Sequence, residues 1–197
     1  MPASFGMGSE SLASFGGLGS TLLYVGIVLI VNGFSRLTGI DPRAQAIMNI
    51  LAGGVGIWNN MVGLVLGAWG SVSGDITGTF TGNFYGCAIG LMFAFTYLFV
   101  AFNNLMSITD GRPFGWFQGF VAINAVIFGA LSWAVDGDWV YAIIYWLWGI
   151  LWFTGWIELV AKKNLGKFVG VLSVFEGIFT AWIPGFMMIR GVWRFCW

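Results

Sequence analysis

The sequence contains no histidine in its 197 residues, and it contains only two cysteines, Cys87 and Cys196. Without histidine, triads of the Ser-His-Asp type, histidine metal sites and histidine pH switches are excluded. Two cysteines cannot form a disulfide framework or a tetrahedral metal site. The chain also lacks a Walker loop, an HExxH motif and a GxSxG motif. We therefore expect no enzyme activity, no cofactor and no metal ion.

Charged residues are scarce as well. Only 8% of the residues are charged, and eight Lys and Arg balance eight Asp and Glu, whereas average proteins carry about 25% charged residues. A nucleic-acid-binding protein would need clusters of basic residues. By contrast, 58% of the residues are hydrophobic. This composition predicts an integral membrane protein that contacts lipid and binds no nucleic acid.

Long apolar stretches predict how the chain crosses the membrane. A transmembrane helix needs about 20 mostly apolar residues. Six stretches meet this condition, over about 18–36, 44–69, 84–106, 114–135, 139–161 and 168–190. They are too long and too continuously apolar for the strands of a β-barrel. We therefore predict an all-α membrane domain over residues 18–197, preceded by a Ser- and Gly-rich, flexible periplasmic tail over residues 1–17.

The distribution of lysine and arginine predicts the orientation of these helices. Six of the eight basic residues fall in the first, third and fifth loops: Arg36, Arg43, Arg112, Lys162, Lys163 and Lys167. The positive-inside rule places these loops in the cytoplasm and both chain ends outside. Arg190 and Arg194 disagree, but beside Trp193 and Trp197 they can snorkel to an interface.

Polar side chains recur near the predicted cytoplasmic ends of the helices. They form three pairs that each flank a turn: Asn32 with Asn49, Asn103 with Asn124, and Glu158 with Glu176. The repeat suggests three consecutive helical hairpins around a central pore. Each asparagine can instead cap a helix or bond a neighbouring helix. Glu176 lies about two turns inside its helix, where a carboxylate costs about 2.5–3.5 kcal/mol, so it must face the interior.

Three helical stripes suggest what lines this interior. Residues at helical spacing form the sets Leu22, Val25, Leu29 and Asn32; Phe93 and Tyr97; and Tyr141, Tyr145, Trp148 and Trp152. Interfacial Trp and Tyr normally gather at helix ends, whereas the third stripe continues through its span. Such a lining predicts a narrow path for a small, neutral, planar solute, from which ions are excluded by their desolvation cost. Plain aromatic packing remains the alternative interpretation.

Several segments resemble a known family. The segments LLYVGIVL at 22–29, FAFTYL at 93–98 and EGIFTAWIP at 176–184 are similar to the AmiS/UreI family of bacterial urea and short-chain amide channels. The resemblance covers about residues 20–190. It implies a homohexamer in the bacterial inner membrane, in which each six-helix protomer has its own pore.

The resemblance also implies two constrictions in this pore. The outer one would use Leu22, Val25, Tyr141 and Tyr145. The inner one would use Leu29, Phe93, Tyr97, Trp148, Leu151 and Trp152, with Glu176 nearby. Tyr141 and Tyr145 stand where some urea-channel relatives are expected to have Trp, so the selectivity can differ.

These observations together predict a passive channel for urea, acetamide or formamide. Acid-activated members of the family use histidines, and this chain has none, so we expect no gating by histidine protonation. Two other functions stay open. One is a proton-coupled secondary transporter of small amides that uses Glu176, and the other is a membrane scaffold that transports nothing.

Overall fold

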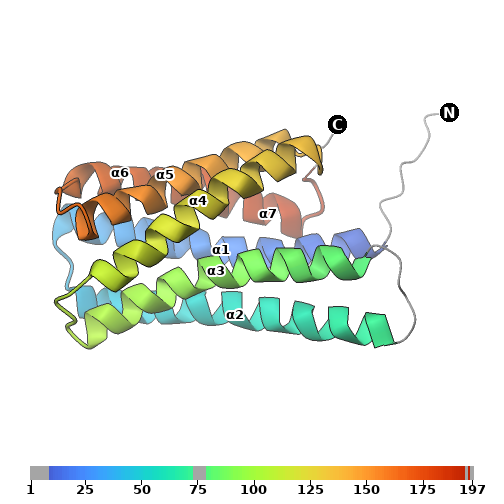
Figure 1. Cartoon of the computed structure of the whole chain (residues 1–197), viewed down its shortest axis with the longest axis horizontal. Coiled ribbons are helices and arrows are strands. Elements are labelled where there is room, and N and C mark those ends of the chain that lie inside the picture. Colours follow the sequence, from blue (N-terminus) through green and yellow to red (C-terminus); the bar gives the residue numbers. More distant parts are fainter. Residues whose placement is uncertain (1–8, 73–78, 194, 196–197) are drawn as a thin grey trace.

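The computed structural model describes residues 9–72, 79–193 and 195, which fold as a bundle of long helices (Figure 1). The helices are α1 (Ser9–Thr38), α2 (Pro42–Val72), α3 (Thr79–Leu105), α4 (Arg112–Ala134), α5 (Trp139–Leu159), α6 (Gly166–Glu176), η1 (Gly177–Trp182) and α7 (Ile183–Ile189). The last three form one continuous helical segment. The described residues thus hold six helical spans that are long and apolar enough to cross a membrane, as the sequence predicts.

Helices α1, α2 and α3 extend further than the sequence predicted. Helix α1 begins at Ser9, so residues 9–17, which were expected in a flexible tail, form its first turns. This stretch contains Glu, Leu and Ala, which favour helix, and a helix can continue past the apolar run that predicted it. Helix α2 continues to Val72 and α3 begins at Thr79 instead of at about residue 84, so the expected loop between them is shorter. The remainder of the predicted tail, residues 1–8, lies outside the described residues.

The helices run alternately up and down, so the connections divide between two ends of the bundle (Figure 1). The α1–α2, α3–α4 and α5–α6 connections lie at one end, which we call the basic end because it carries Arg36, Arg43, Arg112, Lys162, Lys163 and Lys167. The first turns of α1, the α4–α5 turn and the last turn of α7 lie at the opposite end. Arg194 lies outside the described residues.

The helices pair differently from the expected hairpins. The most extensive contacts join α2 with α3, α4 with α5, and α1 with the α6–η1–α7 segment, while α3 touches α4 and α5 touches α6 only slightly. The expected hairpins paired each odd helix with the even helix that follows it. Three tight pairs exist, but they are shifted by one helix along the chain.

Glycines explain this pairing, because small residues let helix backbones approach closely. A Cβ atom on Gly26 of α1 would lie 2.7–2.9 Å from Trp182 of η1, and one on Gly33 would lie 2.5 Å from the carbonyl oxygen of Gly170 in α6. Gly56 of α2 packs in the same way on Ala94 of α3. The short turns bring their two helices to the same end of the bundle, but the glycines decide which helices touch.

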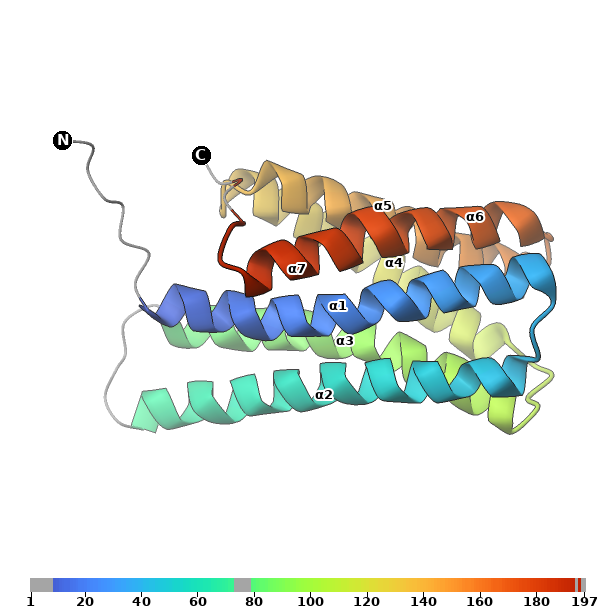
Figure 2. The same cartoon turned by 180° about the vertical axis from the view of Figure 1, so that it is seen from behind.

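The last span changes its helical form midway. Pro184 has no backbone N–H, so the regular pattern of helical hydrogen bonds is interrupted at this position. The structure places a π-helical segment, η1, just before it, and the N–H of Ile183 bonds to the carbonyl of Ile178, five residues back. Single π turns inside helices are rare and often lie at functional sites. In the view of Figure 2, α6, η1 and α7 follow α1 along its length.

Candidate functional site

An aromatic stripe on α5 faces the middle of the bundle. Helix α5 starts directly after Asp138, whose side-chain Oδ1 accepts the backbone N–H of Tyr141 at 2.8 Å and caps the helix. From this start, the three- and four-residue spacing turns Tyr145, Trp148 and Trp152 inward, and each is less than 10% exposed. Tyr141 is partly buried against the same core.

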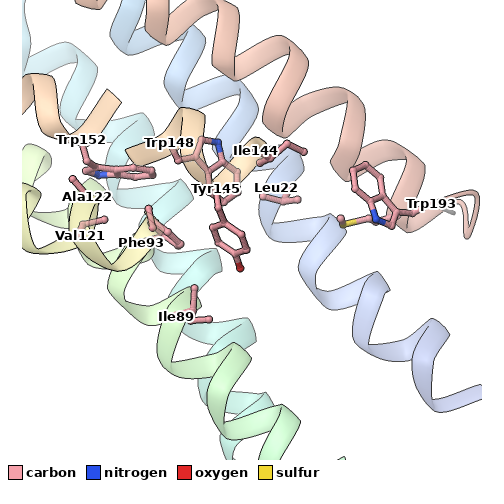
Figure 3. Close-up of a cluster of buried hydrophobic side chains, with 12 residues drawn as sticks. Leu22, Ile89, Phe93, Val121, Ala122, Ile144, Tyr145, Trp148, Trp152 and Trp193 are labelled. Atoms are coloured by element: carbon pink, nitrogen blue, oxygen red, sulfur yellow. The ribbon is translucent and has the colours of Figure 1, made fainter. Parts of the chain in front are cut away.

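Phe93 of α3 meets this stripe from the opposite side (Figure 3). Its ring centroid lies 4.8 Å from Trp152, 5.3 Å from Trp148 and 6.0 Å from Tyr145. The ring centroids of Tyr141 and Tyr145 lie 4.6 Å apart. We call Phe93, Tyr141, Tyr145, Trp148 and Trp152 the aromatic cluster. These rings face one another in the protein interior and not lipid, and their contacts fill the space between the helices.

The predicted stripe on α1 completes the lining. Leu22, Val25 and Leu29 are 3%, 7% and 5% exposed. Leu22 packs in the same core as the aromatic cluster, whereas Val25 and Leu29 pack with Tyr97 and Leu151 in a second core. The two cores do not divide these residues as the two expected constrictions do. Val25 of the expected outer constriction lies in the second core, and Phe93, Trp148 and Trp152 of the expected inner one lie in the first.

Glu176 is the polar residue with the most unusual surroundings. It is completely buried, and among the described residues neither carboxyl oxygen has a hydrogen-bond partner. The hydroxyl of Tyr97, 4% exposed, also has none within that part of the chain. Nearly all buried polar groups are hydrogen-bonded, so three orphan oxygens need a partner such as water or a solute. In residues 9–72, 79–193 and 195, no three His, Cys, Asp or Glu side chains gather where they could hold a metal ion.

Asn32 and Asn49 form a closed amide pair toward the basic end. Asn32 Nδ2 donates to Asn49 Oδ1 at 3.0 Å, and Asn49 Nδ2 donates back to Asn32 Oδ1 at 2.8 Å. Gln45 adds a third amide and donates to Asn32 Oδ1 at 2.6 Å. The sequence reasoning missed Gln45, although its position four residues before Asn49 puts it on the same helix face. The group ties α1 to α2.

The other two predicted polar pairs do not form. Asn124 Nδ2 donates to the carbonyl of Phe120 in its own helix at 2.8 Å, and no hydrogen bond joins it to Asn103 within the described part of the chain. Glu158 pairs with Arg36 at 2.8 Å instead of lying beside Glu176. The reason is the shifted helix pairing, since α3 barely touches α4 and α5 barely touches α6. The threefold polar pattern in the sequence therefore becomes a contact only between α1 and α2.

Two further residues at the site were missed by the sequence reasoning. Thr180 of η1 accepts a hydrogen bond of 2.8 Å from the Trp148 indole N–H. Trp193, which was expected at a membrane interface, is only 4% exposed and donates to Asp138 Oδ2 at 2.6 Å. No local sequence signal marks either bond, because each joins segments that are far apart in the chain.

Comparisons with known proteins agree with this geometry. The sequence pattern of AmiS/UreI family transporters matches residues 18–192. An acid-activated urea channel of Helicobacter pylori is 43% identical over 195 residues, which cover 89% of this chain and 99% of the relative. A protein of Mycolicibacterium smegmatis, provisionally named as an amidate substrates transporter, is 37% identical over 181 residues, which cover 91% of this chain and 78% of the relative.

A solved structure has the same fold. The crystal structure of the Helicobacter pylori urea channel superposes with a TM-score of 0.78 at 42% sequence identity, and the match covers 90% of this chain and 99% of that one. These relatives are channels and transporters and not enzymes.

Proposed function

The chain belongs to the AmiS/UreI family of transporters, and we propose that it is a passive channel for urea and short-chain aliphatic amides. The solute passes through the middle of each subunit, along the aromatic cluster. One observation carries the proposal: the buried carboxyl of Glu176 and the hydroxyl of Tyr97 have no partner in the described protein, although they lie in an otherwise apolar, aromatic interior.

The chemistry of a small amide matches these groups. Urea, acetamide and formamide are neutral and planar, and their N–H groups can donate to carboxyl and hydroxyl oxygens. The orphan oxygens of Glu176 and Tyr97 can accept those hydrogen bonds as the solute passes. The flat face of the amide can stack on Phe, Tyr and Trp rings, whose π-systems favour offset contact. The interior thus offers weak binding along the path and not one tight site.

The proposed path has a narrow outer and a narrow inner part. Leu22, Val25, Tyr141 and Tyr145 line the outer part. The inner part is lined by Leu29, Phe93, Tyr97, Trp148, Leu151 and Trp152, with Glu176 beside them. Because the rings of the aromatic cluster touch, a solute advances as side chains change rotamer, a motion faster than microseconds where a side chain is free to turn. Asn32 and Asn124 extend the polar part of the path toward the basic end.

The same lining excludes ions. A charged solute that leaves water needs compensating charges or dipoles along its whole route. The two buried cores of the described protein consist of apolar and aromatic residues, with Glu176 and Asp138 as buried acids beside them, and the Oδ2 of Asp138 is already bonded to the Trp193 indole. Isolated ions would therefore face a high desolvation cost, whereas the desolvation cost of a neutral amide is much smaller.

The proposal includes the placement of the protein in the membrane. The basic end faces the cytoplasm by the positive-inside rule, and both chain ends lie on the periplasmic side of the bacterial inner membrane. The subunit assembles as a homohexamer in lipid. In support, α2 leaves a broad apolar face uncovered, on which Ile47, Trp58 and Val65 are 62%, 70% and 66% exposed. Lipid or neighbouring subunits would cover this face.

One observation favours a second candidate function. A carboxyl group that is fully buried without a partner can also bind and release a proton during transport. The alternative is therefore a proton-coupled secondary transporter of small amides that uses Glu176. A carrier of this kind accumulates its solute against a gradient, whereas a channel only equilibrates it.

Stopped-flow measurements on proteoliposomes test the proposal. Wild-type protein should speed the equilibration of urea, formamide and acetamide above the rate of protein-free vesicles. Leu29→Trp should slow it, because a larger ring fills the inner part of the path, and Trp152→Ala should admit larger amides. Phe153→Ala is the matched control, since Phe153 neighbours Trp152 but is 49% exposed on the outer surface. A purified protein without any effect on flux would instead favour a scaffold.

A further inference from the structure

The hydroxyl of Thr180 forms two hydrogen bonds at the side of the aromatic cluster. It donates to the carbonyl of Glu176 at 2.6 Å and accepts the indole N–H of Trp148 at 2.8 Å. Thr180 is 2% exposed and Trp148 is 3% exposed. The bond between them is therefore closed to competing water, and the indole has no second N–H with which to form another.

The segment that carries Thr180 is held firmly from the other side. Thr180 lies in η1, whose backbone packs directly on α1, because Cβ atoms on Gly26 and Gly177 would lie within 3.0 Å of the opposite helix. The hydroxyl itself is oriented by its bond to the Glu176 carbonyl one turn earlier. Thr180 is thus a fixed acceptor, and the Trp148 side chain is the part that it orients.

Trp148 occupies the central place in the aromatic cluster. Its ring contacts all four others, at centroid distances of 5.3 Å to Phe93, 5.6 Å to Tyr145, 6.2 Å to Trp152 and 6.2 Å to Tyr141. The direction of this one indole therefore decides how much room the neighbouring rings leave. Figure 3 shows Trp148 between Trp152 and Tyr145, with Phe93 facing them.

We infer that Thr180 is a positioning residue that fixes the plane of the Trp148 indole and thereby sets the largest amide that the path accepts. The inference rests on the proposed function and names a determinant of its specificity. Thr180 acts through Trp148 and not by contact with the solute. A free indole would sample further rotamers, and the path would discriminate less sharply between small and larger amides.

The test compares permeabilities of urea and propionamide in proteoliposomes. Thr180→Val keeps the shape of the side chain but cannot accept the indole N–H. It should lower the urea-to-propionamide permeability ratio about three- to tenfold, the effect of one lost hydrogen bond. Thr180→Ser keeps the hydroxyl and should restore the ratio to within about twofold of wild type. If Thr180→Val does not reach the membrane, Thr180→Ala removes the same acceptor without an added methyl group.

Two controls separate positioning from a general structural effect. Thr154→Val removes another buried hydroxyl, which donates to the Leu151 carbonyl at 2.6 Å but accepts no indole N–H, and it should leave the ratio unchanged. In a Trp148→Phe background, which has no indole N–H, Thr180→Val should have no further effect on the ratio. An unchanged ratio in Thr180→Val, or an equal change in the Trp148→Phe background, overturns the inference. A wild-type protein that conducts no amide overturns the proposed function instead.

Discussion

The indole N–H of Trp193 donates a hydrogen bond of 2.6 Å to Oδ2 of Asp138, although the two residues lie 55 positions apart. The other carboxyl oxygen of Asp138 caps α5 through the N–H of Tyr141. One buried carboxylate thus starts the helix that bears the aromatic stripe and fastens the segment after α7 beside it. The ring centroids of Trp193 and Tyr141 lie 6.2 Å apart. The bond between Trp193 and Asp138 thus extends the core of the aromatic cluster toward the end opposite the basic end.

Asp138→Ala should therefore destabilise the protein measurably. It removes the cap of α5 and leaves the Trp193 indole unpaired, and together these losses should lower the free energy of unfolding by about 1–3 kcal/mol. Thermal unfolding in detergent, followed by near-ultraviolet circular dichroism, measures the change. Asp136→Ala is the control, because Asp136 is exposed on the same turn and its loss should shift stability by less than about 0.5 kcal/mol. Equal melting of both variants contradicts the role of Asp138.

The contact of α1 with the last helical span makes a second prediction. A Cβ atom on Gly26 would lie 2.8 Å and 2.9 Å from backbone atoms of Trp182, which cannot move aside as a flexible side chain can. Gly26→Ala should destabilise the fold by about 1–3 kcal/mol, the usual cost of overpacking. Gly54→Ala is the matched control, since a Cβ atom there meets nothing within 4 Å and alanine favours helix over glycine by up to about 1 kcal/mol. Melting temperatures of both variants in one detergent test this prediction, since only Gly26→Ala should melt below the wild type.

The helices and their inward faces could be predicted from the sequence, because both follow from local patterns. Apolar length predicts a span in lipid, and helical spacing put Leu22 and Trp152 on faces that the structure buries. Each face follows from the spacing of residues within its own helix, so its prediction needed no knowledge of the neighbouring helices.

The contacts between helices could not be predicted in the same way. Short turns suggested that α3 pairs with α4, but the tight partner of α4 is α5. For this reason the polar pair Asn103 and Asn124, which flanks the α3–α4 turn, is not joined by a hydrogen bond in the described residues. The π-helical form of η1 and the bond from Trp148 to Thr180 depend on how η1 fits against α1 and α5, and a sequence pattern along one helix does not contain that information.

Glu176→Gln should distinguish a channel from a proton-coupled carrier. Glutamine has nearly the same shape and keeps a carbonyl oxygen that accepts hydrogen bonds, but it cannot exchange a proton. In a channel, downhill urea flux should therefore persist and change by less than about tenfold, the effect of one altered hydrogen bond. Uptake of labelled urea into proteoliposomes, with and without an imposed proton gradient, measures both properties. Uphill accumulation in the wild type that disappears in Glu176→Gln would establish the carrier and refute the channel.

The response to acid provides the last prediction. Histidine is the side chain whose ordinary pKa lies between pH 5 and 8, and this chain has none, so urea flux should change by less than about twofold between pH 7 and pH 5. At the basic end, hydrogen bonds from the Arg112 guanidinium hold the pKa of Asp110 well below its usual range. A depressed pKa contributes stability that is lost only when the pH falls through the folded-state pKa, so this ion pair stays intact at pH 5.

Flux measured in the same vesicles at both pH values, with equal pH on the two sides, checks this prediction. The control is Asp136→Asn, which removes an exposed acid opposite the basic end and should behave like the wild type. A large increase in wild-type flux at pH 5 contradicts the prediction. If Asp136→Asn abolished that increase, the Asp136 carboxyl group would take part in gating the path.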